Sequence, residues 1–273
     1  PTSIIDKIKT YDEKSDFAKV TGIDDGEEQT VLDFGIKKGM NKGIIGNAHA
    51  SIGTHNRYAE RLMGALFKDK SRVMLMGNAN NTNDKGFPGG GGGGHFGGGL
   101  KGLNSSKMMG ANFNYNRNKI FILDGSIRWN HSNGDVRTEQ STENFVSNIG
   151  SFSNSFNQNY TRSNSWDARL RMEWKPDTMT NIMFRPTIKY STSDGLSSST
   201  SASYNDDPYL YVTNPLSPES ILQMAEDSLM VNTRKNNSIT YSENKSLGIM
   251  LQINRKLNSK GRNVTLRTNV TYN

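Results

Sequence analysis

Residues 166–174 read Trp-Asp-Ala-Arg-Leu-Arg-Met-Glu-Trp, so apolar and polar side chains alternate along the whole segment. Side chains two residues apart share one face of a β-strand, and the alternation therefore predicts a strand with one apolar and one polar face. The short turn 175–178, Lys-Pro-Asp-Thr, leads into residues 182–190, which alternate in the same way. Pro186 is unusual for a central strand and predicts a bulge or a local edge.

The same two-faced pattern recurs in residues 121–129, 247–253 and 264–272. Rows of roughly ten residues are long enough to cross a bilayer at the usual tilt, whereas sandwich strands usually have about 5–6. Trp166 and Trp174 end one apolar row and lie roughly 26 Å apart along a strand. Aromatic girdles of outer-membrane barrels have about this spacing, although two ordinary core tryptophans remain an alternative.

Nine long strands are expected between residues 43 and 273, and they form an antiparallel meander. The predicted segments are 44–53, 57–68, 71–82, 105–116, 119–133, 160–175, 178–194, 240–257 and 262–273. Short turns join them at one end, and long polar stretches join them at the other: 84–104, 130–160 and 195–240. This asymmetry is typical of a transmembrane β-barrel, because its two rims face different compartments. The fold class is therefore all-β, and the odd strand number indicates an incomplete barrel.

The composition agrees with a barrel wall. Of the 273 residues only 33% are hydrophobic, which is low for a soluble domain with a large core. A wall needs apolar residues on one strand face only. Cysteine is absent, which excludes disulfides and thiolate chemistry. The net charge of +7 comes from residues spread along the strands, and this favours solvated positions over a nucleic-acid site.

Local motifs give no support for an enzyme, a cofactor or a metal. The Gly-rich loop 86–99 lacks the Gly-Lys-Ser/Thr ending of a phosphate-binding loop and is expected to be a flexible surface loop. The four histidines do not have metal-ligand spacing. The acidic turn 22–28 does not fit a calcium loop. Ser217-Pro218-Glu219 predicts the start of a short helix over 218–226 whose apolar stripe is Ile221, Leu222 and Ala225.

Residues 1–38 differ from the rest, with strand candidates at 4–9 and 31–38. The runs Ile-Ile-Asp-Lys-Ile (4–8), Thr-Gly-Ile-Asp-Asp-Gly (21–26) and Leu-Asp-Phe-Gly-Ile-Lys-Lys (32–38) resemble the end of a plug domain. Gly-Asn-Ala-His-Ala-Ser-Ile-Gly-Thr (46–54) resembles the first barrel strand that follows such a plug. The pattern is similar to TonB-dependent outer-membrane receptors of the outer-membrane-protein β-barrel branch. The resemblance assigns residues 1–38 to the C-terminal end of a plug domain and 39–273 to the N-terminal part of the barrel.

The resemblance implies uptake of an unknown small ligand across the outer membrane of a Gram-negative bacterium. It implies outer-membrane lipid and an inner-membrane energising complex as partners, the latter through a missing N-terminal part, with a surface lipoprotein as a further candidate. No nucleic acid is expected. Two other functions remain open: a non-transporting outer-membrane barrel for adhesion or assembly, and a secreted soluble β-protein that binds carbohydrate.

The alternation assigns side chains to the two faces. The candidates for the barrel lumen are Arg169, Arg171, Glu173, Arg185, Lys189 and Arg267. The candidates for the lipid face are Trp166, Leu170, Trp174, Phe184 and Ile188. Basic residues predominate in the first set, which suggests an anionic ligand or an acidic plug surface. An arginine at Leu170 is expected to disrupt membrane assembly, while an arginine at Thr187 is expected to be tolerated.

Overall fold

A computed structural model gives the fold of the chain. It describes residues 5–14, 18, 26, 28–36, 42–83, 102–146, 149, 151–258 and 262–273. The Gly-rich loop 86–99 lies outside the described residues, as does most of the acidic turn 22–28.

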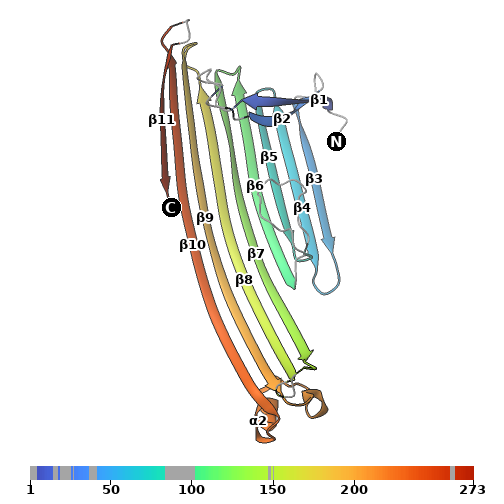
Figure 1. The fold of residues 1–273 in the computed structure, drawn as a ribbon. Helices are drawn as coiled ribbons and strands as arrows, with labels where there is room; N and C mark the ends of the chain where they lie inside the picture. The colour runs from blue at the N-terminus through green and yellow to red at the C-terminus, as the bar shows by residue number, and fades with distance from the viewer. Residues whose placement is uncertain are drawn as a thin grey trace.

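One antiparallel sheet of nine strands makes up most of the described chain (Figure 1). Its strands follow one another in chain order from β3 to β11, so the sheet is a simple meander. The strands are β3 (Lys42–Ile52), β4 (Tyr58–Lys68), β5 (Ser71–Asn80), β6 (Leu103–Arg117), β7 (Phe121–Glu143), β8 (Phe152–Trp174), β9 (Thr180–Tyr204), β10 (Met230–Lys256) and β11 (Asn263–Tyr272). The predicted all-β antiparallel meander and its nine strands are confirmed.

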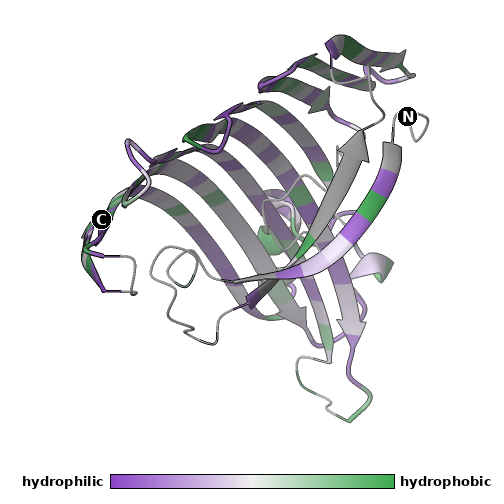
Figure 2. Ribbon diagram, turned by 90° about the horizontal axis from the view of Figure 1, so that it is seen from above, coloured by the Kyte–Doolittle hydropathy of each residue, from purple (hydrophilic) through white to green (hydrophobic). Residues whose placement is uncertain are grey.

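Two further strands form a separate antiparallel hairpin, β1 (Ile5–Lys14) with β2 (Glu28–Ile36). Seen from above, the nine strands of the large sheet follow an arc, and the hairpin lies on the hollow side of this arc (Figure 2). Both predicted N-terminal strands are therefore present, and each is longer than the sequence pattern indicated.

Tight connections join the strands at one end of the sheet. Asp69 and Lys70 link β4 to β5, residues 118–120 link β6 to β7, and residues 175–179 link β8 to β9. Asn118 and Lys119 both have positive φ, 53° and 60°, as the turns that best match the twist of a hairpin require. We call this end the turn end and the opposite end the loop end.

At the loop end the predicted strand limits were wrong. The polar stretches 130–160 and 195–240 were expected to be loops, but most of their residues continue β7, β8, β9 and β10. These four strands contain 23 to 27 residues each and run far past β3–β6 (Figure 1). Serine and asparagine have low strand propensity, but pairing with a neighbouring strand at every position overrides that preference.

The connector between β9 and β10 contains a short 3₁₀-helix, η2 (Pro208–Leu210), and the helix α2 (Pro218–Glu226). Ser217 caps α2 as predicted, since its hydroxyl oxygen accepts a hydrogen bond from the Ser220 N–H at 3.1 Å. The predicted apolar stripe was wrong: Leu222 and Ala225 are exposed, and Met224 is fully buried against Ala202 and Tyr204.

Pro186 causes no bulge, but it lies at a local gap in the pairing of β9 with β8. β9 keeps one register with β8 on both sides of it, but the ladder is interrupted where Leu170 and Arg171 face Arg185 and Pro186. A proline lacks the N–H that this ladder would use. Pairing of Pro186 with Ile249 on β10 is retained.

Candidate functional site: an apolar belt and a polar face

The strand register sorts the side chains of the sheet into two faces. Directly paired residues point to the same face, and successive residues point to opposite faces. Phe113 pairs with Gly125, which pairs with Leu170. Their neighbours Asn112, Ser126 and Arg169 pair in the same way on the other side. We call these the apolar face and the polar face.

A continuous band of uncharged, mostly hydrophobic residues crosses the apolar face near the turn end. We call it the apolar belt, and its larger members are Ile44, Leu62, Leu66, Val73, Leu75, Met109, Phe113, Phe121, Leu123, Ile127, Trp166, Leu170, Met172, Trp174, Ile182, Phe184, Ile188, Leu247, Ile249, Leu251, Ile253, Leu266 and Val270.

Burial in the sheet is the reverse of what a soluble protein shows. In the belt, Leu62 is 59% exposed and Ile188 is 52% exposed. On the polar face, Asn80 and Asn254 are 1% exposed and Gln252 is 2% exposed. Crowding of the polar side chains marks their face as the hollow side of the arc. The hydrophobic side chains thus point outward, where no other described part of the chain covers them, and large exposed apolar patches mark interaction surfaces.

Two groups of aromatic residues border the belt. Toward the loop end, Trp129, Trp166 and Tyr190 lie side by side on β7, β8 and β9, with the two tryptophan rings 6.2 Å apart. Toward the turn end, Phe121 pairs with Trp174, and its ring lies 6.3 Å from that of Tyr115. The strands therefore present amphipathic rings at both margins and smaller apolar side chains between them.

Charged residues on the apolar face begin where the belt stops. At the turn end, Lys42 forms an ion pair with Asp69 at 2.9 Å. At the loop end, Lys245 forms an ion pair with Glu243 at 2.8 Å and lies over the Tyr190 ring. The other flanking charges are Glu60, Lys68, Lys107, Arg117 and Arg255.

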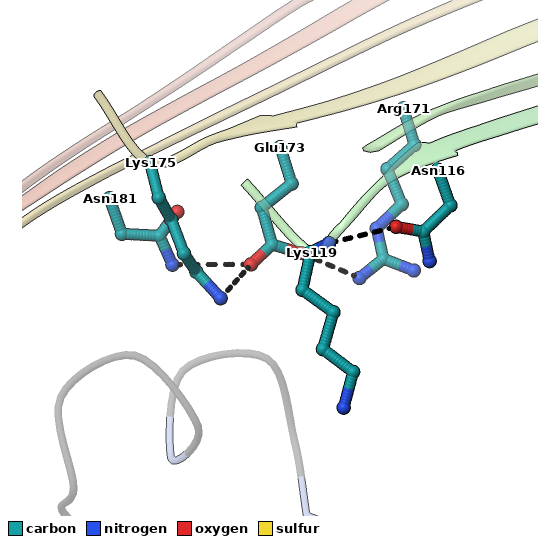
Figure 3. Close-up of polar contacts among 6 residues, drawn as sticks. All are labelled: Asn116, Lys119, Arg171, Glu173, Lys175 and Asn181. Atoms are coloured by element: carbon teal, nitrogen blue, oxygen red, sulfur yellow. Dashed lines mark hydrogen bonds and ion pairs between the residues drawn. The ribbon is translucent and has the colours of Figure 1, made fainter. Parts of the chain in front are cut away.

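Glu173 is the centre of a polar cluster on the opposite face (Figure 3). Its carboxylate lies 3.1 Å from the Lys175 ammonium and 3.4 Å from the Arg171 guanidinium, and it accepts a hydrogen bond from the Asn181 amide at 3.4 Å. Glu173 is only 8% exposed, so the two cations and the amide compensate a carboxylate that has lost most of its water.

The structure places the six lumen candidates together on the polar face. Arg169 forms an ion pair with Asp167 at 2.9 Å, and Lys189 pairs with Asp167 across the strands. Arg185 lies on β9, and Arg267 lies on the edge strand β11. All five lipid-face candidates lie in the apolar belt on β8 and β9.

Four buried amides on the polar face were not predicted: Asn78, Asn80, Gln252 and Asn254. The Asn80 amide donates to the Asn78 side-chain oxygen at 3.1 Å and to the Ser106 hydroxyl at 3.0 Å. The Asn254 amide donates to the Thr265 hydroxyl at 2.7 Å. Gln252 and Asn254 alternate with the apolar row Leu251 and Ile253, and this alternation would have identified them.

Beyond the loop-end aromatic residues, four strands continue as a sheet that is polar on one face and mixed on the other, where Leu196 and Ile239 lie among polar residues. We call residues 130–143, 152–165, 191–204 and 230–244 the polar extension. On its polar face every residue is Ser, Thr, Asn or Gln, apart from Gly134, Val136, Gly195 and Arg234. Cross-strand contacts such as Ser132 with Ser163, at 2.7 Å, link these side chains.

Within the described ranges, no three His, Asp or Glu side chains are grouped to hold a metal ion. Among the same residues, no helix is long and apolar enough to cross a membrane. No family model matches the chain, and no curated protein matches it.

Proposed function

We propose that this chain forms part of the wall of a TonB-dependent transporter in the outer membrane of a Gram-negative bacterium. The single observation that carries the location is the apolar belt, which is uncharged and bordered by aromatic residues. A strand segment from Trp166 to Trp174 spans roughly 26 Å, close to the hydrocarbon thickness that a tilted strand crosses. The belt faces lipid, and the polar face lines the interior.

The transport role has two supports. Residues 4–58 resemble the junction between plug and barrel in this family, and the β1–β2 hairpin lies on the hollow side of the sheet (Figure 2). In this reading the hairpin is the last part of a plug, and the charged residues of the polar face, among them Arg169, Lys189 and Arg267, border the plug or the ligand path.

The location is tested with charge placed on the two faces. In the full-length gene expressed in a Gram-negative host, Leu170→Arg is expected to abolish the heat-modifiable folded form in outer-membrane fractions. A cation at mid-membrane costs about 2–4 kcal/mol on a lipid-facing site. Asn112→Arg, at nearly the same depth on the polar face, and Thr187→Arg are expected to keep that form. Equal loss in all three variants would contradict the facing of the strands.

The transport role is tested separately by growth on a panel of single nutrient sources. A strain that lacks the gene and a strain that lacks the inner-membrane energising complex are expected to share a growth defect on at least one source. A gene deletion that impairs surface attachment and no growth condition would instead favour an adhesion barrel. Release of the protein into the medium without detergent would overturn the membrane location.

A further inference from the structure

Three methionines from three neighbouring strands lie next to one another on the polar face. Met63 on β4 pairs directly with Met76 on β5. Met108 on β6 pairs with Asn78, the next residue of β5 on the same face, and is therefore the diagonal neighbour of Met76. Directly paired side chains have Cβ atoms ~5 Å apart, and diagonal neighbours lie ~7–8 Å apart. We call Met63, Met76 and Met108 the methionine trio, and one small ion can contact all three side chains.

Gly110 leaves space for the central side chain of the trio. Met76 pairs with Gly110 across β5 and β6. A Cβ atom at Gly110 would lie 3.2 Å from the Met76 Cγ atom and 3.6 Å from its sulfur, so the thioether extends over the strand that carries Met108. All three side chains of the trio are half-buried, and a solute on the hollow side of the arc can therefore reach them.

The two faces of β4 and β5 carry different hydrophobic residues. The large belt residues of these strands are leucine and valine: Leu62, Leu66, Val73 and Leu75. Every methionine of the two strands lies on the polar face instead: Met63, Met74 and Met76. Leucine fills nearly the same volume as methionine, so what methionine adds at these positions is a polarisable sulfur.

The charges near the trio are positive. Arg61 on β4 and Arg128 on β7 border it on the same face. Along the described strands, no carboxylate pairs with a member of the trio or lies diagonal to one. Calcium and magnesium ions need oxygen ligands, above all carboxylates, and these surroundings therefore disfavour them.

We propose that the methionine trio is a binding site for Cu(I). Thioether sulfur is a soft ligand that selects this ion, and the chain has no cysteine whose thiolate would compete for it. Binding is coordination alone, because each sulfur donates a lone pair and copper stays in the Cu(I) state. His49 on β3 is exposed on the same face, diagonal to Met63, and its imidazole is a further ligand that suits copper.

The site goes beyond the proposed transport function. It depends on the pairing of β4, β5 and β6 and not on uptake of a ligand, so failure of either proposal leaves the other standing.

Competition for Cu(I) tests the site. The full-length protein, purified in detergent micelles, is titrated without oxygen in the presence of ascorbate against bicinchoninate, a coloured Cu(I) chelator. Met76→Leu and Met108→Leu are each expected to weaken Cu(I) binding at least about ten-fold, which is ~1.4 kcal/mol. X-ray absorption of the copper-loaded parent protein is expected to show sulfur atoms bound to copper.

Met109→Leu is the matched control, because Met109 follows Met108 on β6 but lies on the apolar face, where it is 66% exposed. It is expected to change the affinity less than about two-fold. Heat modifiability checks that each variant is folded. The proposal is overturned if the parent protein takes no Cu(I) from the chelator, or if copper is bound without sulfur. Equal effects of Met108→Leu and Met109→Leu would also overturn it.

Discussion

At the scale of single residues, Gly125 shows how closely packed the belt is. Phe113 pairs with Gly125 across β6 and β7, and its ring occupies the space that a side chain at 125 would need. A Cβ atom there would lie 2.6 Å from the ring and 3.0 Å from the Arg169 carbonyl oxygen. The ring can turn away, but the backbone carbonyl cannot move without displacing β8.

Gly125→Val is therefore expected to destabilise the sheet by about 1–3 kcal/mol, the usual cost of overpacking. The measurement is urea unfolding in micelles followed by tryptophan fluorescence. Phe113→Ala in the same chain is expected to recover part of the loss, because the two positions are in contact and their effects are not additive. Strict additivity of the two substitutions would show that the ring contact is irrelevant.

Asp177, in the turn between β8 and β9, predicts a pH dependence. Its carboxylate accepts hydrogen bonds from the Met179 N–H at 2.7 Å and the Thr180 hydroxyl at 3.0 Å. These two donors hold the pKa of Asp177 below its ordinary value, and the Met179 N–H has the largest effect. The positive charge of Arg255 lowers the pKa further. The stabilising contribution is thus present above the ordinary pKa of about 3.9 and is lost as the pH falls through the lower folded pKa.

Asp177→Asn keeps an acceptor oxygen but cannot ionise. The parent chain is expected to be more stable than this variant at about pH 6, and the difference is expected to shrink as the pH falls below about 4. Urea midpoints measured over this range check the sign. A difference that grows on acidification would contradict the hydrogen-bonding of the turn.

At the scale of elements, the turn ends of the strands were predictable from the sequence and the loop ends were not. The alternation that defines 121–129 or 247–253 exists because one face is apolar, and it weakens where that face becomes a mixture of polar and hydrophobic residues. β7 nevertheless continues to Glu143, and β10 begins at Met230. Backbone pairing between neighbours extends these strands, and a sequence pattern of side chains does not record that pairing. The face of each candidate residue followed directly from the two-residue period, whereas the contact of Asn181 with Glu173 depended on how β9 pairs with β8.

The helix α2 was predictable in its limits but not in its packing. Its N-cap depends on local chemistry, while the burial of Met224 depends on Tyr204, a residue at the far end of β9.

Ser217→Ala is expected to weaken α2 by about 1 kcal/mol through loss of the cap. Hydrogen exchange of the 218–226 amides should accelerate several-fold while the strands stay protected. Thr213→Ala, an exposed change in the same connector, should leave exchange unaltered.

At the scale of the whole molecule, two isoleucine positions can be used to test whether the sheet is a membrane wall or a soluble sheet. Ile188 in the belt and Ile239 in the polar extension project from the same face of neighbouring strands and are 52% and 83% exposed. The chain has no cysteine, so single Cys substitutions take a spin label at one site only.

In lipid vesicles, a label at position 188 is expected to be accessible to oxygen and shielded from a water-soluble nickel complex, and a label at 239 is expected to show the reverse. The lipid interior concentrates oxygen and excludes the charged complex. Equal access of the nickel complex to both labels would place the belt in water and contradict the membrane location.

The polar face of the polar extension has a consequence for whatever moves along it. It offers hydroxyl and amide groups almost without charge or aromatic rings. Each such hydrogen bond stabilises a bound solute by only about 0.5–1.5 kcal/mol net, because the solute gives up a hydrogen bond to water when it forms one to the protein. A solute would therefore exchange one weak hydrogen bond for another as it moves along this surface, without being held at any one position. Stronger binding of the solute would begin only where arginine guanidinium groups are present.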